Sequence, residues 1–269
     1  MQRFREKTAI VTGGSKGLGR VMAGRLVAEG AEVLVAGRAE EDLTRAVAEI
    51  EAEGGSAYLL AGDVAAPGFC ADLIDEALRR WGRIDVLVNN AGVFDEAPFL
   101  EAELENWDFV IDVMLKAPFL LSQRVGRSMV ENGGGAIVHL SSIDGHAVDG
   151  PFTSYSVAKA GLMQLSKNIA VELGPKGVRS NTVSPGWALT PMVEAATDAE
   201  ELERMKHDFK RVPLQRMVTP EEVAAAVCFL ASEEASGITG TDLVVDGGTI
   251  ADLYILPTLE GGEGSSGEG

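Results

Sequence analysis

Residues 8–19 of this chain read Thr8-Ala9-Ile10-Val11-Thr12-Gly13-Gly14-Ser15-Lys16-Gly17-Leu18-Gly19, and they decide its fold. A short apolar strand comes first, a glycine turn follows, and a helical pattern continues after Gly19. Glycines allow the backbone to turn sharply and to approach a pyrophosphate, while the start of the next helix offers free N–H groups and a partial positive charge. A glycine turn can also simply connect a strand to a helix. The spacing here, Gly-x-x-x-Gly-x-Gly, differs from the Gly-x-Gly-x-x-Gly of the standard dinucleotide fingerprint.

Strand-like segments recur along the chain and alternate with segments of helical period. After Thr8–Val11 they are Glu32–Ala36, Ala57–Ala61, Ile84–Val88, Ala136–Leu140, Arg179–Val183 and Asp242–Val245. This alternation predicts an α/β fold with a single domain, a Rossmann-like doubly wound parallel sheet with helices on both faces. Gly13, Asn89 and Ser142 each follow a strand, so we expect them to meet at the edge where such sheets bind ligands.

The predicted domain spans residues 1–257, and residues 258–269 form an acidic tail rich in glycine and serine. We expect this tail to be disordered, because it carries almost no apolar side chain to bury. The segment before it, Tyr254–Pro257, is apolar and could cover its own subunit or pack on a neighbouring one.

Composition narrows the range of partners and locations. With 23 Lys and Arg against 41 Asp and Glu, the chain has a formal net charge of −18, which argues against nucleic acid or an anionic membrane as a general partner. The charged N-terminus leads straight into the first strand and no apolar run reaches about 18 residues, so we expect a cytoplasmic protein. The chain has only three histidines, and two of them, His139 and His207, are scattered, so we expect no metal site.

The stretch Tyr155-Ser156-Val157-Ala158-Lys159 places a phenol and an ammonium four residues apart, on one face of a predicted helix. A nearby cation stabilises a phenolate and lowers the tyrosine pKa, which makes Tyr155 a candidate general acid/base. Ser142, after the strand Ala136–Leu140, could hold a carbonyl oxygen beside it, with Ser141 as the alternative. Alone, the pair Tyr155 and Lys159 could equally be an amphipathic surface pair.

Taken together, these motifs resemble the classical short-chain dehydrogenase/reductase (SDR) family over about Lys7 to Gly248. The motifs that carry the resemblance are the glycine turn, Asn89-Asn90-Ala91-Gly92, Ser142, Tyr155, Lys159 and Pro185-Gly186. The resemblance implies an oxidoreductase that interconverts a carbonyl and a secondary alcohol by hydride transfer, with catalytic residues Ser142, Tyr155 and Lys159. It also implies a homo-oligomer, a homotetramer or a dimer.

The same resemblance implies a nicotinamide dinucleotide cofactor. Its expected contacts are Gly13, Ser15, Lys16, Gly17, Leu18, Gly19, Arg38, Asp63, Val64, Asn90, Ala91, Gly92, Tyr155, Lys159, Pro185, Gly186 and Thr190. NAD(H) selectivity normally needs an acidic residue at the end of the second strand, where this chain has Gly37 followed by Arg38. Arg38 and Lys16 could instead bind a 2′-phosphate, so NADP(H) is favoured over NAD(H).

One position departs from the family pattern: Met114 stands where an asparagine usually helps to hold a water that joins the lysine to solvent. A thioether cannot replace an amide in a proton relay. Slower turnover or a different water path could follow, with Asp112 or Lys116 as candidate substitutes. The alternative from another class is a redox sensor that binds NADP(H) without catalysis.

Substrate clues are mixed. Asp144, His146 and Asp149, between the serine and the tyrosine, indicate a polar substrate with hydroxyls or a cationic group. Trp187 and Met192, which we expect to form a movable lid over the site together with the charged stretch Thr197 to Lys210, favour an apolar portion. A carbonyl reductase is the first hypothesis, and a sugar or polyol dehydrogenase and a 3-oxoacyl thioester reductase are the alternatives within the family.

Overall fold

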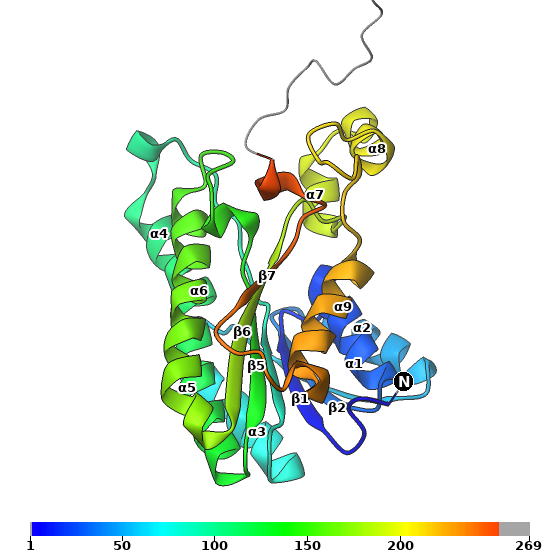
Figure 1. Cartoon of the computed structure of the whole chain (residues 1–269), viewed down its shortest axis with the longest axis vertical. Helices are drawn as coiled ribbons and strands as arrows, with labels where there is room; N and C mark the ends of the chain where they lie inside the picture. The colour runs from blue at the N-terminus through cyan, green and yellow to red at the C-terminus, as the bar shows by residue number, and fades with distance from the viewer. Residues whose placement is uncertain (1, 253–269) are drawn as a thin grey trace, which may run out of the picture.

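A seven-stranded parallel sheet forms the centre of the computed structural model, which describes residues 2–252, apart from the side chains of Met192 and Ala196 (Figure 1). All seven predicted strands are confirmed, in the spatial order β3-β2-β1-β4-β5-β6-β7. Their bounds are β1 Thr8–Thr12, β2 Glu32–Gly37, β3 Ser56–Ala61, β4 Val86–Asn89, β5 Gly135–Leu140, β6 Val178–Pro185 and β7 Asp242–Val245. The order reverses between β1 and β4, and this switch point is where open α/β sheets hold their ligands.

Helices cover both faces of the sheet, as predicted. Helices α1, α2 and α9 share one apolar core with the sheet, while α3, α5 and α6 share the other (Figure 1). The helix bounds are α1 Gly17–Ala28, α2 Glu40–Ala52, α3 Phe69–Trp81, α4 Leu104–Ile111, α5 Ala117–Glu131, α6 Thr153–Leu173, α7 Pro191–Ala196, α8 Ala199–His207 and α9 Pro220–Ala231.

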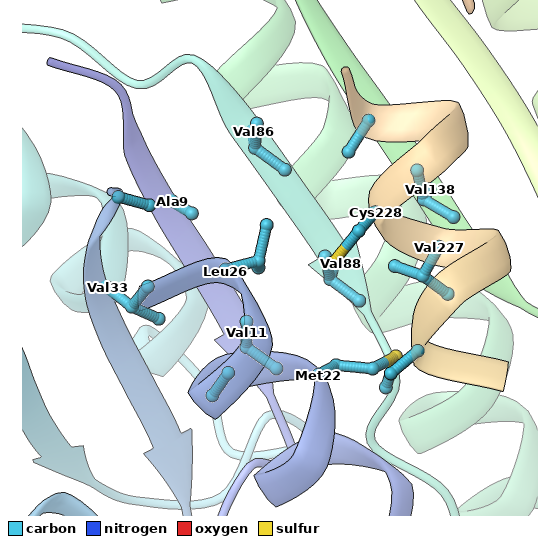
Figure 2. Close-up of a cluster of buried hydrophobic side chains, with 14 of the residues drawn as sticks. Ala9, Val11, Met22, Leu26, Val33, Val86, Val88, Val138, Val227 and Cys228 are labelled. Atoms are coloured by element: carbon cyan, nitrogen blue, oxygen red, sulfur yellow. The ribbon is translucent and has the colours of Figure 1, made fainter. Parts of the chain in front are cut away.

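The alternation of side chains along β1 explains how one strand serves two cores. Ala9 and Val11 point to the side of α1 and α9, whereas Ile10 points to the side of α3 and α5. Figure 2 shows the first of these cores, in which strand residues meet Met22 and Leu26 of α1 and Val227 and Cys228 of α9. Because all of these side chains are almost fully buried, β1 is fixed from both sides and the turn after it has a rigid base.

Most strands lie within one residue of their expected bounds, whereas β4 and β6 differ by two residues at one end. Strand β4 begins at Val86 rather than Ile84, because the Asp85 carboxylate accepts hydrogen bonds from the backbone N–H and the hydroxyl of Thr8. The helical region from Leu104 to Glu131 is divided by a π-helical turn at Asp112–Lys116, where the Ala117 N–H donates to the Asp112 carbonyl. Pro118, next in the chain, has no N–H with which to continue the α-helical pattern.

Some expectations concern residues outside those described. The acidic tail at 258–269 and the segment Tyr254–Pro257 both lie there. Within residues 2–252, no helix has the length and apolar character needed to cross a membrane. The same residues contain no group of three or more His, Cys, Asp or Glu side chains that could hold a metal ion.

Candidate active site

A cavity of about 460 Å³ opens at the carboxyl ends of the central strands. Every residue that the sequence analysis assigned to the cofactor lines it, from Gly13 in the turn after β1 to Thr190 before α7. Ser142, Tyr155 and Lys159 line it as well. The fold therefore brings together, in one cavity, the residues of five motifs that lie far apart in the sequence.

The glycine turn is held in place by Asn90. Gly13 has a φ of +65°, and a Cβ there would lie 2.8 Å from the Ala91 Cα, so a side chain is excluded. The Asn90 Nδ2 donates to the carbonyls of Thr12 at 2.9 Å and Gly13 at 3.0 Å. The Thr12 hydroxyl in turn accepts from the backbone N–H groups of Asn90 and Ala91. The motif after β4 thus fixes the shape of the turn after β1, a role that sequence reasoning did not assign to Asn90.

The turn delivers the chain into α1, which begins at Gly17 without a side-chain cap on its first N–H groups. A Cβ at Gly19 would lie 2.2 Å from the Gly13 carbonyl oxygen, so the helix can approach the turn this closely only with glycine at that position. Uncapped N–H groups and the helix dipole at the edge of a cavity suit a phosphate.

The two predicted phosphate cations have different surroundings. The Lys16 ammonium pairs with the Asp42 carboxylate of α2 at 2.7 Å. Arg38 is exposed, lines the cavity and forms no ion pair with the described residues. Gly37 precedes it at the end of β2, so no carboxylate stands at the position that selects against a 2′-phosphate.

Lys159 is buried, with 5% of its surface exposed, and its ammonium donates to the Leu140 carbonyl at 2.6 Å. Burial lowers its pKa to about 8, although Asp144 opposes the shift. The ammonium lies 5.4 Å from the centroid of the Tyr155 ring. A carbonyl at the end of β5 therefore anchors this lysine beside the tyrosine.

The pKa of Tyr155 shifts in the direction opposite to the prediction. Burial raises it to about 12, the Ser142 hydroxyl partly offsets this, and the Asp144 charge adds to it. The direction is opposite to the expected decrease because removal of the phenolate from water outweighs the Ser142 hydrogen bond that favours it. Tyr155 is consequently a protonated phenol at neutral pH and is suited to donate a proton.

The two serines after β5 have separate partners. The Ser141 hydroxyl donates to the Lys159 carbonyl at 2.9 Å and so holds α6 against the strand end. The Ser142 hydroxyl accepts from the Asp144 N–H at 3.1 Å and lies 3.5 Å from an Asp144 carboxylate oxygen. Burial and the neighbouring Asp149 raise the pKa of Asp144. Of the two serines, Ser142 is the one whose hydroxyl is not bound to the backbone of α6.

Four of the predicted substrate residues, Asp144, His146, Asp149 and Trp187, do not line the cavity. The His146 Nε2 lies 2.7 Å from the Asp242 carboxylate of β7, and Asp149 forms an ion pair with Arg211. Trp187 packs edge-on against Phe209, with ring centroids 6.0 Å apart. The Met192 side chain is outside the described part of the structure. His146 and Asp149 are therefore engaged with other parts of the same chain, whereas the buried Asp144 Oδ1 has no hydrogen-bond partner among the described residues.

Comparison with known proteins identifies the family. A family model described as Enoyl-(Acyl carrier protein) reductase matches residues 13–249. The crystal structure of a short-chain type dehydrogenase/reductase from Mycobacterium marinum superimposes with a TM-score of 0.86 at 34% identity, covering 93% of this chain and 97% of that one. The chain belongs to the short-chain dehydrogenase/reductase family. Its members are oxidoreductases that use nicotinamide cofactors, so this short-chain dehydrogenase/reductase is an enzyme of that kind.

Two relatives of this short-chain dehydrogenase/reductase act on different compounds. The D-threitol dehydrogenase of Mycolicibacterium smegmatis is 37% identical over 246 residues, covering 91% of this chain and 94% of that enzyme. The 3-oxoacyl-acyl-carrier-protein reductase of Thermotoga maritima is 34% identical over 248 residues, covering 92% and 99%. Similarity of this degree fixes the family and leaves the substrate open.

Met114 is the departure of this short-chain dehydrogenase/reductase from its family pattern. Its side chain is 1% exposed and lines the cavity from the π-helical turn. Asp112 and Lys116, the candidate substitutes for the missing amide, pair with each other at 2.9 Å on the exposed side of the helix. An apolar thioether therefore occupies this part of the cavity wall.

Proposed function

We propose that the chain is an NADP(H)-dependent oxidoreductase that interconverts a ketone and a secondary alcohol, with Tyr155 as the general acid/base. The strongest support is that Ser142, Tyr155 and Lys159 line the same cavity as the glycine turn and the uncapped start of α1. A pure binding module has no need of a serine, a phenol and a buried ammonium at one end of a dinucleotide cavity.

The cavity fits a nicotinamide dinucleotide. Glycines at positions where a Cβ would collide give a phosphate room, and the free Arg38 can meet a 2′-phosphate. The bound nicotinamide supplies or accepts the hydride. For reduction, Ser142 donates a hydrogen bond to the substrate oxygen, and Tyr155 transfers its proton to that oxygen as the new C–H bond forms. A pKa of about 12 keeps the phenol protonated at neutral pH, so that it has a proton to donate.

Lys159 contributes positive charge near the phenolate that remains after proton transfer, since its ammonium lies 5.4 Å from the Tyr155 ring centroid. With Met114 in place of the usual asparagine, we propose that the proton returns to Tyr155 by a path that does not use a side chain at position 114. A non-catalytic sensor of NADP(H) is the alternative that Met114 keeps open.

The preference for NADP(H) is supported by Gly37 and Arg38 at the end of β2. The pairing of Lys16 with Asp42 leaves Arg38 as the principal candidate for the phosphate. A sugar or polyol dehydrogenase remains the second candidate, favoured by the similarity to D-threitol dehydrogenase.

The deciding experiment is a fluorescence titration with NADPH and NADH, followed by reduction of a panel of ketones, sugars and acyl thioesters. Tyr155→Phe should lower kcat by at least about 100-fold, because the proton donor is lost while the ring remains. Tyr58→Phe is the matched control, since its hydroxyl lies 3.4 Å from Glu32 at the sheet edge, away from the cavity. Full activity in Tyr155→Phe, or tight NADPH binding without turnover of any compound, would contradict the proposed function.

A further inference from the structure

An aromatic pair adjoins Tyr155 and has no assigned role. Phe94, in the segment after β4, has its ring centroid 4.6 Å from that of Phe152 and 5.9 Å from that of Tyr155. We call Phe94 and Phe152 the aromatic wall. Phe94 is 47% exposed, although its ring touches the residue that handles the substrate proton in the proposed function. An exposed apolar ring in contact with a reactive side chain is an available binding surface.

The position of the wall determines what it can touch. The substrate oxygen must come within hydrogen-bond distance of the Tyr155 hydroxyl. The groups on the reacting carbon therefore lie within a few ångströms of that hydroxyl. Burial of an apolar group against Phe94 removes both surfaces from water. Two of the three polar side chains that could compete for the substrate are engaged elsewhere, His146 with Asp242 and Asp149 with Arg211.

Charge near the wall restricts the substrate further. Between residues 94 and 115 the sequence contains seven carboxylates and no lysine or arginine. A cleft of about 240 Å³ adjoins the wall, and Asp95 and Glu103 lie among its lining residues together with Leu104 and Trp107. Apolar surface with a negative border accommodates an uncharged substrate and disfavours an anionic one.

We propose that Phe94 determines specificity: its ring, supported by Phe152, binds the apolar body of an uncharged ketone or alcohol and selects ring-bearing substrates over small or anionic ones. This inference rests on the proposed function, because it presumes that a carbonyl reacts at Tyr155.

The test compares cyclohexanone with acetone as substrates for reduction by NADPH. Wild-type kcat/KM should be at least about tenfold higher for cyclohexanone, since apolar contacts of a few methylene groups discriminate by this order. Phe94→Ala should reduce that ratio by about fivefold or more, and Phe94→Leu should retain most of it. Leu100→Ala is the control, because Leu100 is a 94% exposed apolar side chain of the same segment that is not among the lining residues of the cleft beside the aromatic wall or of the cofactor cavity.

A second pair of substrates tests the preference for an uncharged substrate over an anionic one. The methyl ester of 4-oxocyclohexanecarboxylate should be reduced about tenfold more efficiently than the free acid at low ionic strength, and added salt should narrow the difference. Equal losses for both ketones in Phe94→Ala, or a preference for acetone or for the free acid, would overturn the inference while the proposed function stood. Failure to reduce any ketone, with NADPH still bound, would overturn the proposed function and the inference with it.

Discussion

Burial, more than the nearest charges, determines the direction in which the pKa values of Lys159 and Tyr155 shift. Burial lowers the pKa of Lys159 to about 8 and raises that of Tyr155 to about 12, so both are pushed toward their neutral forms. The pattern Tyr-x-x-x-Lys predicted that the two side chains would lie together, and they do. It could not predict the tyrosine pKa, because that depends on how much water the surrounding elements exclude.

His139 shows the same effect deeper in the sheet. It is fully buried on β5, and burial lowers its pKa from 6.5 to about 3. Its Nδ1 lies 3.2 Å from the Asn89 amide nitrogen, which can only donate, so Nδ1 accepts and Nε2 carries the proton toward the Ser180 hydroxyl.

We expect His139 to make the fold sensitive to acid. Above pH 6.5 the His139 side chain is neutral in both the folded and the unfolded protein. Between pH 6.5 and about pH 3 the unfolded chain binds a proton at His139, whereas the folded chain does not. The free energy of unfolding should therefore fall by up to about 1.4 kcal/mol per pH unit in this window. Urea unfolding of wild type and His139→Gln between pH 7 and pH 4 should show a shallower decline in the variant.

His207→Gln serves as the control for this measurement, because His207 is exposed on α8. Identical slopes for wild type and His139→Gln would refute the role assigned to His139.

At the level of elements, alternation of apolar strands and helical segments was sufficient to predict the sheet and its coverage. The break in the helix at Asp112–Lys116 was not predicted, since Pro118 is compatible with an early helix position and the π-turn needs three-dimensional context. The polar residues in the loop after Ser142 were likewise predicted to contact the substrate. His146 instead pairs with Asp242, whose position opposite the loop follows only from the placement of β7.

Asn90 couples two elements, the turn after β1 and the end of β4. Asn90→Ala removes the donor to two carbonyls and should destabilise the fold by about 1–3 kcal/mol. It should also weaken NADPH binding by about tenfold, because the phosphate-facing turn loses its brace. Urea unfolding and NADPH fluorescence titration would measure the two effects.

Asn168→Ala is the matched control, since Asn168 donates one hydrogen bond within α6 on the exposed side of the helix. If Asn90→Ala binds NADPH as tightly as the wild type does, the turn keeps its shape without the amide and the prediction is contradicted.

At the scale of the whole molecule, helices α4, α5 and α6 carry several large exposed apolar side chains. They are Leu104, Phe109, Phe119, Leu120, Val157 and Val171. Monomeric proteins seldom expose such a group, so we propose association of copies through these helices.

Sedimentation velocity at micromolar concentration should therefore give a dimer or tetramer. Phe119→Lys should shift it toward monomer, because a charge in an apolar interface is costly to bury. Leu214→Lys, at a 63% exposed residue outside these helices, should leave the mass unchanged. A monomeric wild type would contradict the proposed association.

During synthesis, the protein completes its cofactor cavity late. Along the sequence, the residues that line the cofactor cavity begin at Gly13, include Ser142, Lys159 and Pro185, and end at Val193. Strand β1 pairs with β2 on one side, and its partner on the other side, β4, is synthesised later. A nascent chain of half length on the ribosome thus has the glycine turn and the lining residues up to Met114, but it lacks Ser142, Lys159 and Pro185. Cofactor binding can therefore stabilise the newly made protein only near the end of translation, and the earlier stages of folding depend on the apolar cores alone.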